Sequence, residues 1–177
     1  MEIIFLGYGN LGEPLRKFFI NSKNLKVISL KNTNEETFQK FTETISSKKI
    51  IFDLMDPNKI DTHTNKKLLK KEKKFREIIS KSNFIKQYIF FSSANLYEPC
   101  LDKIKETSSI IQSSFSEYLI LKRNSEKYLL TLKLPLTICR IPNIWGHAAT
   151  NSFFSDLLEA KKNKRLISYR KGDDEVI

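Results

Sequence analysis

Short runs of nearly continuous apolar residues alternate with longer segments of mixed character along the chain. The runs that we expect to form strands are Glu2–Leu6, Leu25–Leu30, Lys49–Leu54, Gln87–Ser92 and Leu136–Ile141, with a shorter sixth at Arg165–Ser168. Strands that are apolar on both sides are typical of parallel sheets that helices cover on both faces. The alternation therefore predicts an α/β fold, namely a Rossmann-type, doubly wound parallel sheet in a three-layer α/β/α arrangement.

The segments between these strands have the patterns of helices. We expect helices at Leu11–Ile20, Glu35–Ser46, Asn65–Lys81, Ser116–Leu130 and Asn151–Lys162, with Asn34 as the N-cap of the second. A chain of 177 residues is long enough for one domain with a sizeable core and too short for two. Because no Pro- or Ser-rich linker divides the sequence, we expect residues 1–177 to form a single domain.

The stretch GYGNLG follows the first expected strand and leads into the first expected helix, and it holds three of the chain's 5 glycines. Glycines at this place let the backbone approach a pyrophosphate closely and let the helix pack tightly on the strand, while the helix N-terminus attracts phosphate. The candidate cofactor-binding residues of this turn are Gly7, Gly9, Asn10, Leu11 and Gly12. The alternative is a glycine-rich turn that binds nothing.

Tyr118 and Lys122 are four residues apart, so they share one face of an expected helix. A nearby ammonium group lowers the pKa of a phenol from its usual value of about 10, and the tyrosine can then exchange a proton with an alcohol or a carbonyl. Ser93, directly after an expected strand, could hold the same oxygen atom. Together these side chains could assist hydride transfer to or from a nicotinamide. A YxxxK pair on a solvated helix face is the common alternative.

The order of these features resembles the extended short-chain dehydrogenase/reductases, the NAD-dependent epimerase/dehydratase family that acts on nucleotide sugars. The resemblance rests on the glycine turn, on the stretches SSANLY and EYLILK, and on the strand that ends in RIPNIWG. It implies an NAD(P)-dependent nucleotide-sugar epimerase or reductase, with hydride transfer at a sugar carbon. The catalytic residues that it implies are Tyr118, Lys122 and Ser93. It also implies cofactor contacts from Ser92, Lys122 and Pro142, and substrate contacts from Asn143 and Ser93.

Several positions depart from the family's pattern. Lys31 stands where the family usually has an aspartate for the adenosine ribose; since a lysine can meet a 2′-phosphate, we expect NAD or NADP with a lean toward NADP. Met55 and Asp56 replace two small residues that normally let the cofactor lie against the backbone. Ala94 and Asn95 stand in place of the Asp-Glu pair of nucleotide-sugar dehydratases, which disfavours dehydration.

Two segments of the family's pattern are not found in this sequence. The span between Leu30 and Lys49 is too short for the family's extra strand and helix, and the sequence stops at Ile177, where the family continues. We therefore expect a domain that lacks most of the C-terminal substrate-binding part, with a homodimer or a partner chain to complete the substrate site. The alternative is a non-catalytic dinucleotide-binding module, or an inactive fragment of such an enzyme.

Charge and composition limit the remaining function classes. The net charge of +11 favours polyanionic partners, but the lysine-rich segment Asn65–Lys81 has the apolar spacing of an amphipathic helix, so nucleic acid is not the expected partner. The 2 cysteines have no neighbours at metal-ligand spacing, which predicts no metal site. No apolar run approaches the about 20 residues that span a bilayer, and no signal-peptide pattern is found. We expect a cytoplasmic protein without membrane contact.

Overall fold

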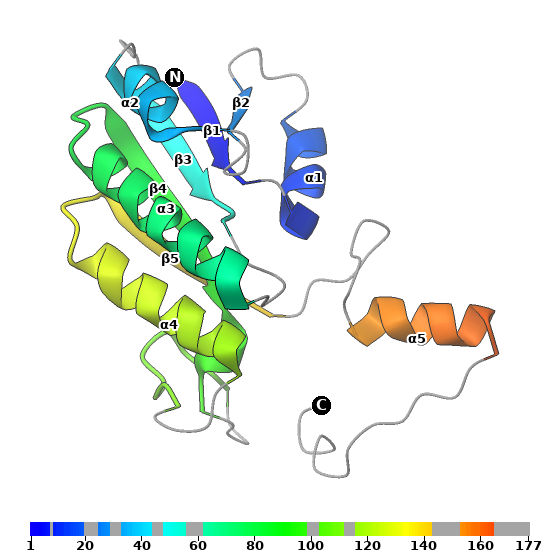
Figure 1. Ribbon diagram of the computed structural model, residues 1–177. Coiled ribbons are helices and arrows are strands. Elements are labelled where there is room, and N and C mark those ends of the chain that lie inside the picture. Colours follow the sequence, from blue (N-terminus) through cyan, green and yellow to red (C-terminus); the bar gives the residue numbers. More distant parts are fainter. Residues whose placement is uncertain are drawn as a thin grey trace.

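The computed structural model of the protein describes residues 1–7, 9–19, 25–28, 33–43, 48–55, 62–98, 103–111, 116–142 and 153–164. Strands and helices alternate within these ranges (Figure 1). The strands are β1 (Glu2–Leu6), β2 (Leu25–Ile28), β3 (Lys49–Asp53), β4 (Ile85–Ser93) and β5 (Leu136–Ile141). The helices are α1 (Gly9–Phe18), α2 (Glu35–Glu43), α3 (Thr62–Ser80), α4 (Glu117–Leu130) and α5 (Phe153–Lys162), with a short 3-10 helix, η1, at Ala94–Leu96.

The five strands form one parallel sheet in the order β2-β1-β3-β4-β5. The dinucleotide-binding fold has the strand order 3-2-1-4-5-6. Without its third strand, and with the remaining strands renumbered, that order becomes the one found here. As the sequence predicts, the span between β2 and β3 is too short to hold the additional strand and helix. All strands end at the same edge of the sheet, so segments that follow them meet there. The predicted Rossmann-type parallel sheet is confirmed.

One face of the sheet carries the main hydrophobic core. Helices α2, α3 and α4 lie along this face (Figure 1) and supply Phe38, Phe75 and Leu129 to the core. The rings of Phe38 and Phe75 stack with their centroids 3.9 Å apart, which joins α2 to α3. The strands contribute every second residue, because side chains alternate across a pleated strand; these residues are Ile4, Leu6, Ile51, Tyr88 and Phe90.

The opposite face packs through aromatic rings beside α1. Phe5 is fully buried and meets Phe52 edge-on at 5.3 Å and Phe19, which follows α1, at 6.1 Å. Edge-to-face contacts at these distances are favourable for aromatic pairs. Helix α1 therefore lies on this face and α2, α3 and α4 lie on the other, as the doubly wound prediction requires.

Local signals set several element boundaries. The Asn34 side chain accepts a hydrogen bond from the backbone N–H of Thr37 at 2.7 Å, so the predicted N-cap of α2 is confirmed. Ser116 caps α4 in the same way, through Leu119 N–H at 3.4 Å. The predicted start of α1 at Leu11 is two residues late, because Gly9 already adopts the helical conformation.

Two predictions need separate comment. The expected strand Arg165–Ser168 lies outside the described residues. No helix in the described part of the chain is both long enough and apolar enough to cross a membrane.

Candidate active site

A tight turn joins β1 to α1 at the carboxyl edge of the sheet. Gly7 has φ +84°, a conformation that favours glycine, and its N–H donates to the Ile28 carbonyl at 2.9 Å. A β-carbon at Gly7 would lie 3.0 Å from the Leu54 carbonyl oxygen. Backbone conformation and close packing therefore both require glycine at this position.

The N-terminus of α1 follows this turn directly. Gly9, Asn10 and Leu11 lie in its first turn, where backbone N–H groups have no acceptor within the helix and the helix dipole is positive. Gly12 is buried, which allows the close approach that was predicted for it. These residues fit a dinucleotide, because free N–H groups at a helix N-terminus bind phosphate oxygens.

Two serines end β4 at the same edge. Ser93 is 7% exposed, and its hydroxyl oxygen accepts a hydrogen bond from the Asn95 N–H at 3.3 Å, which caps η1. The Ser93 hydroxyl proton takes no part in that bond. Ser92 is buried, and its hydroxyl has no hydrogen-bond partner within the part of the chain that the structure describes.

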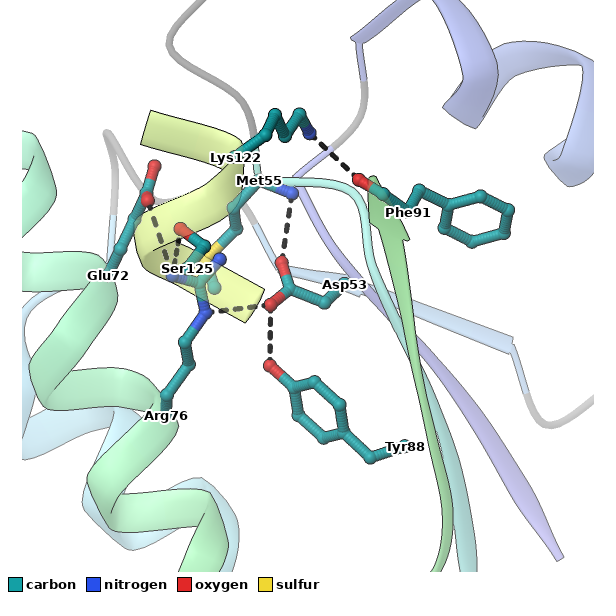
Figure 2. Close-up of polar contacts among 8 residues, drawn as sticks. All are labelled: Asp53, Met55, Glu72, Arg76, Tyr88, Phe91, Lys122 and Ser125. Atoms are coloured by element: carbon teal, nitrogen blue, oxygen red, sulfur yellow. Dashed lines mark hydrogen bonds and ion pairs between the residues drawn. The ribbon is translucent and has the colours of Figure 1, made fainter. Parts of the chain in front are cut away.

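Tyr118 and Lys122 occupy the first turns of α4, beside the end of β4. The Lys122 ammonium donates to the Phe91 carbonyl at 2.8 Å (Figure 2). The same ammonium lies 5.7 Å from the centroid of the Tyr118 ring. It also lies 5.2 Å from the Phe90 ring. Lys122 is 6% exposed, so the carbonyl and the two ring faces compensate for much of its lost hydration. The helix thus holds a buried cation against the predicted acid/base residue.

One turn further along α4, an ion pair joins this helix to β5. The Arg140 guanidinium donates two hydrogen bonds to the Glu126 carboxylate, at 2.9 and 2.8 Å. These bonds raise the pKa of Arg140 above its ordinary value, and the guanidinium also lies 4.8 Å from the Tyr97 ring. Sequence reasoning missed this pair, although Glu126 lies four residues after Lys122 and Arg140 interrupts an apolar strand.

A second buried ion pair lies beneath the end of β3. The Asp53 carboxylate accepts from Arg76 Nε at 2.8 Å, from the Tyr88 hydroxyl at 2.6 Å and from the Met55 N–H at 3.1 Å (Figure 2). Arg76 Nη1 also reaches Ser125 of α4 at 3.3 Å. The signal in the sequence was a single carboxylate inside the apolar run IIFDL.

Burial and charge perturb the groups around Asp53. Burial raises the pKa of the Tyr88 phenol well above its usual range, and the neighbouring Asp53 carboxylate raises it further. Burial is the largest single effect on the pKa of Arg76, and by itself it would lower that pKa. The attraction of Asp53 and the smaller contributions of Tyr88 and Glu72 together outweigh burial, so the pKa of Arg76 is raised. Arg76 therefore stays charged inside the protein.

The remaining predicted residues are placed as follows. Pro142 is exposed directly after β5, at the carboxyl edge. Met55, which replaces one of the family's two small residues, has a side chain that is 4% exposed and belongs to the core. Lys31, Asp56 and Asn143 lie outside the described residues, and the side chain of Asn10 is not described. Among the described residues, no group of three metal-ligating side chains lies together.

Comparison with known proteins adds evidence from structure alone. No protein-family model matches the sequence, and no curated protein is similar to it. A UDP-glucuronic acid 4-epimerase from Bacillus cereus, solved with NAD, superposes with a TM-score of 0.73 at 14% identity, over 93% of this chain and 64% of that one. The Bordetella bronchiseptica enzyme WbmG, solved with NAD, has a TM-score of 0.74 at 16% identity, over 94% of this chain and 61% of that one. A dTDP-4-dehydrorhamnose reductase from Clostridium acetobutylicum has a TM-score of 0.69 at 17% identity, over 92% of this chain and 60% of that one.

The chain has the fold of these enzymes. The predicted resemblance to the extended short-chain dehydrogenase/reductases is thus confirmed at the level of the fold, and the chain spans less than two thirds of the length of these relatives. Two of the three relatives were solved with NAD. The lean toward NADP is not supported, because these two structures hold NAD, and Lys31, on which the lean rests, lies outside the described residues.

Proposed function

We propose that this chain is the dinucleotide-binding part of a nicotinamide-dependent epimerase or reductase that acts on nucleotide sugars. The observation that carries the proposal is the buried Lys122 ammonium, fixed by the Phe91 carbonyl beside the Tyr118 ring. The glycine turn and Ser93 lie at the same edge of the sheet. This edge of a parallel α/β sheet is where ligands usually bind.

Each side chain has a distinct role in the proposed reaction. Tyr118 accepts a proton from a sugar hydroxyl, or returns one to the corresponding carbonyl oxygen. Lys122 favours the phenolate form of Tyr118 by its charge, and Ser93 donates its hydroxyl proton to the reacting oxygen. A bound nicotinamide ring supplies the hydride acceptor or donor. Gly9, Asn10 and Leu11 would hold the pyrophosphate through their backbone N–H groups.

Nucleotide sugars are the proposed substrates because relatives were solved with such ligands. One structure of the Bacillus cereus epimerase holds UDP-glucuronic acid and NAD, and the protein MoeE5 was solved with UDP-glucose and NAD.

We place the protein in the cytoplasm, where these ligands and reduced thiols occur. Residues 1–177 are proposed to form one domain, and a homodimer or a partner chain would complete the sugar pocket.

A second candidate is a dinucleotide-binding module without turnover. The chain covers 60–64% of the length of the three enzymes compared above, so the likeness in fold does not by itself carry their turnover to this chain. This candidate keeps the glycine turn and the buried Lys122 but needs no substrate. It predicts that NAD binds and that no sugar nucleotide is converted.

Calorimetry with NAD and NADP tests binding, and NADH absorbance with chromatography of UDP-glucose and UDP-glucuronic acid tests turnover. Tyr118→Phe should lower turnover by about 10²–10⁴-fold while NAD still binds, because a general acid/base contributes that much. Tyr128→Phe is the matched control, since it makes the same change near the far end of α4 and should leave turnover unchanged. Unchanged turnover in Tyr118→Phe would rule out the proposed mechanism.

A further inference from the structure

The glycine turn rests on the two residues that follow β3. We call Leu54 and Met55 the β3 exit segment. The Leu54 N–H donates to the Leu6 carbonyl at 2.9 Å, just before the turn. The Leu54 carbonyl oxygen lies 3.0 Å from the place where a β-carbon of Gly7 would be. Any displacement of this segment therefore moves the floor of the glycine turn.

The Asp53 carboxylate fixes the same segment from below. One oxygen accepts from the Met55 N–H at 3.1 Å, an interaction that holds the backbone in a turn two residues on. The other oxygen accepts from Arg76 Nε at 2.8 Å and from the Tyr88 hydroxyl at 2.6 Å. The arginine and the tyrosine thus satisfy one carboxylate oxygen, and the other oxygen holds the exit segment.

Stability alone is a weak reason for this arrangement. Asp53 is fully buried and Arg76 is 3% exposed, and well-packed apolar residues often stabilise a protein as much as such a pair does. An apolar residue at position 53 would fill the space, but it could not accept the Met55 N–H. The arrangement is therefore explained best by the geometry that it imposes on the backbone beside the turn.

We propose that Asp53 is a positioning residue for the dinucleotide site and that it acts through the Met55 N–H on the exit segment and the glycine turn. This role rests on the proposed function. It concerns residues that sequence comparison did not connect, since Arg76 follows Asp53 by 23 positions and lies in a different element.

Two double variants separate this role from the burial of charge. Asp53→Asn with Arg76→Met (D53N/R76M) removes both charges and keeps an acceptor for the Met55 N–H. Asp53→Leu with Arg76→Met (D53L/R76M) removes both charges and the acceptor, with a side chain of similar shape. Tyr88→Phe is a third variant that loses one bond to Asp53 but keeps the contact with Met55.

The first measurement is calorimetric NAD affinity at a temperature where each variant is folded. D53L/R76M should bind NAD about tenfold or more weakly than D53N/R76M, because small displacements of a binding site cost that much. D53N/R76M and Tyr88→Phe should bind within about twofold of the unmodified protein. Equal affinities of the two double variants would overturn the proposal. If D53L/R76M does not fold, a loss of NAD affinity in either of the other two variants would overturn it.

The second measurement needs no cofactor. Amide hydrogen exchange at Gly7 and Leu54, whose N–H groups bond Ile28 and Leu6, should be faster in D53L/R76M than in D53N/R76M. Equal exchange at these two amides would show that Asp53 does not hold the segment. If the unmodified protein binds no NAD, the proposed function fails, and the exchange result still decides whether Asp53 positions the turn.

Discussion

The Arg76→Met substitution leaves the Asp53 carboxylate buried without its cation. Arg76 Nε and Asp53 Oδ2 lie 2.8 Å apart, and the Arg76 side chain is 4% exposed and that of Asp53 0%. Methionine has a similar length and no charge, so it fills the space without replacing the interaction. The carboxylate would keep two donors, the Tyr88 hydroxyl and the Met55 N–H.

The expected cost follows from this burial. Breaking a buried ion pair by removing one partner costs about 3–5 kcal/mol, because the remaining charge is not compensated. Since two donors stay in place, we expect the lower end, about 3 kcal/mol. For a chain of this size, that corresponds to a fall in Tm of about 6–12 °C. The loss is a large part of a typical folding free energy of about 5–15 kcal/mol.

Urea denaturation followed by circular dichroism measures the free energy of unfolding. Lys40→Met is the matched control: the Lys40–Glu36 pair is as short, 2.7 Å, but its side chains are 70% and 75% exposed. That control should change stability by about 0.5 kcal/mol or less. If Arg76→Met and Lys40→Met cost the same, or if Arg76→Met costs less than about 1 kcal/mol, burial does not set the strength of the pair and the reasoning is wrong.

Three further predictions concern single side chains. Gly7→Ala should destabilise the protein by about 1–3 kcal/mol in urea denaturation, because its φ is +84° and a β-carbon would press against Leu54; an unchanged midpoint would contradict this. Burial, and then the hydrogen bond to Glu77, raise the pKa of Tyr128 to about 12. Because the pKa of Tyr128 is higher in the folded state than in the unfolded state, where it is about 10, the stabilisation by the neutral phenol is present below pH 10 and is lost as the pH rises toward 12. Between pH 10 and pH 12 the Tyr128→Phe variant should therefore lose less stability than the unmodified protein in alkaline titrations. Asn34→Ala should cost about 1 kcal/mol through the lost N-cap, and thermal unfolding would show no shift if the cap contributes nothing.

Local sequence determined much of the fold. The strands Glu2–Leu6 and Leu136–Ile141 have the predicted bounds, because their apolar runs end sharply at turn residues. Asn34 and Ser116 marked helix starts through hydrogen bonds that span three residues. Such signals depend on neighbours in sequence, so a sequence pattern can carry them.

The buried ionic contacts could not be predicted in the same way. The sequence IIFDL reveals an acid in a strand, but Arg76 and Tyr88 reach it from 23 and 35 residues away. The sequence shows that Met55 replaces a small residue of the family's pattern, but not that its side chain belongs to the core. Which face a side chain takes after a strand ends depends on tertiary packing, and a single sequence does not record it. The roles of Tyr118, Lys122 and Ser93 stay predictions.

The strand order has a consequence for how the chain folds. β1 lies between β2 and β3, and its residue Glu2 pairs with Lys49. The middle of the sheet therefore cannot form until the chain has closed the loop between these two residues. Each parallel neighbour likewise needs a crossover connection instead of a tight hairpin. Such distant pairings lose chain entropy before they gain contacts, which slows folding compared with helical proteins of similar size. During that interval the apolar strands of the nascent chain are exposed, and they are the segments that a chaperone would bind.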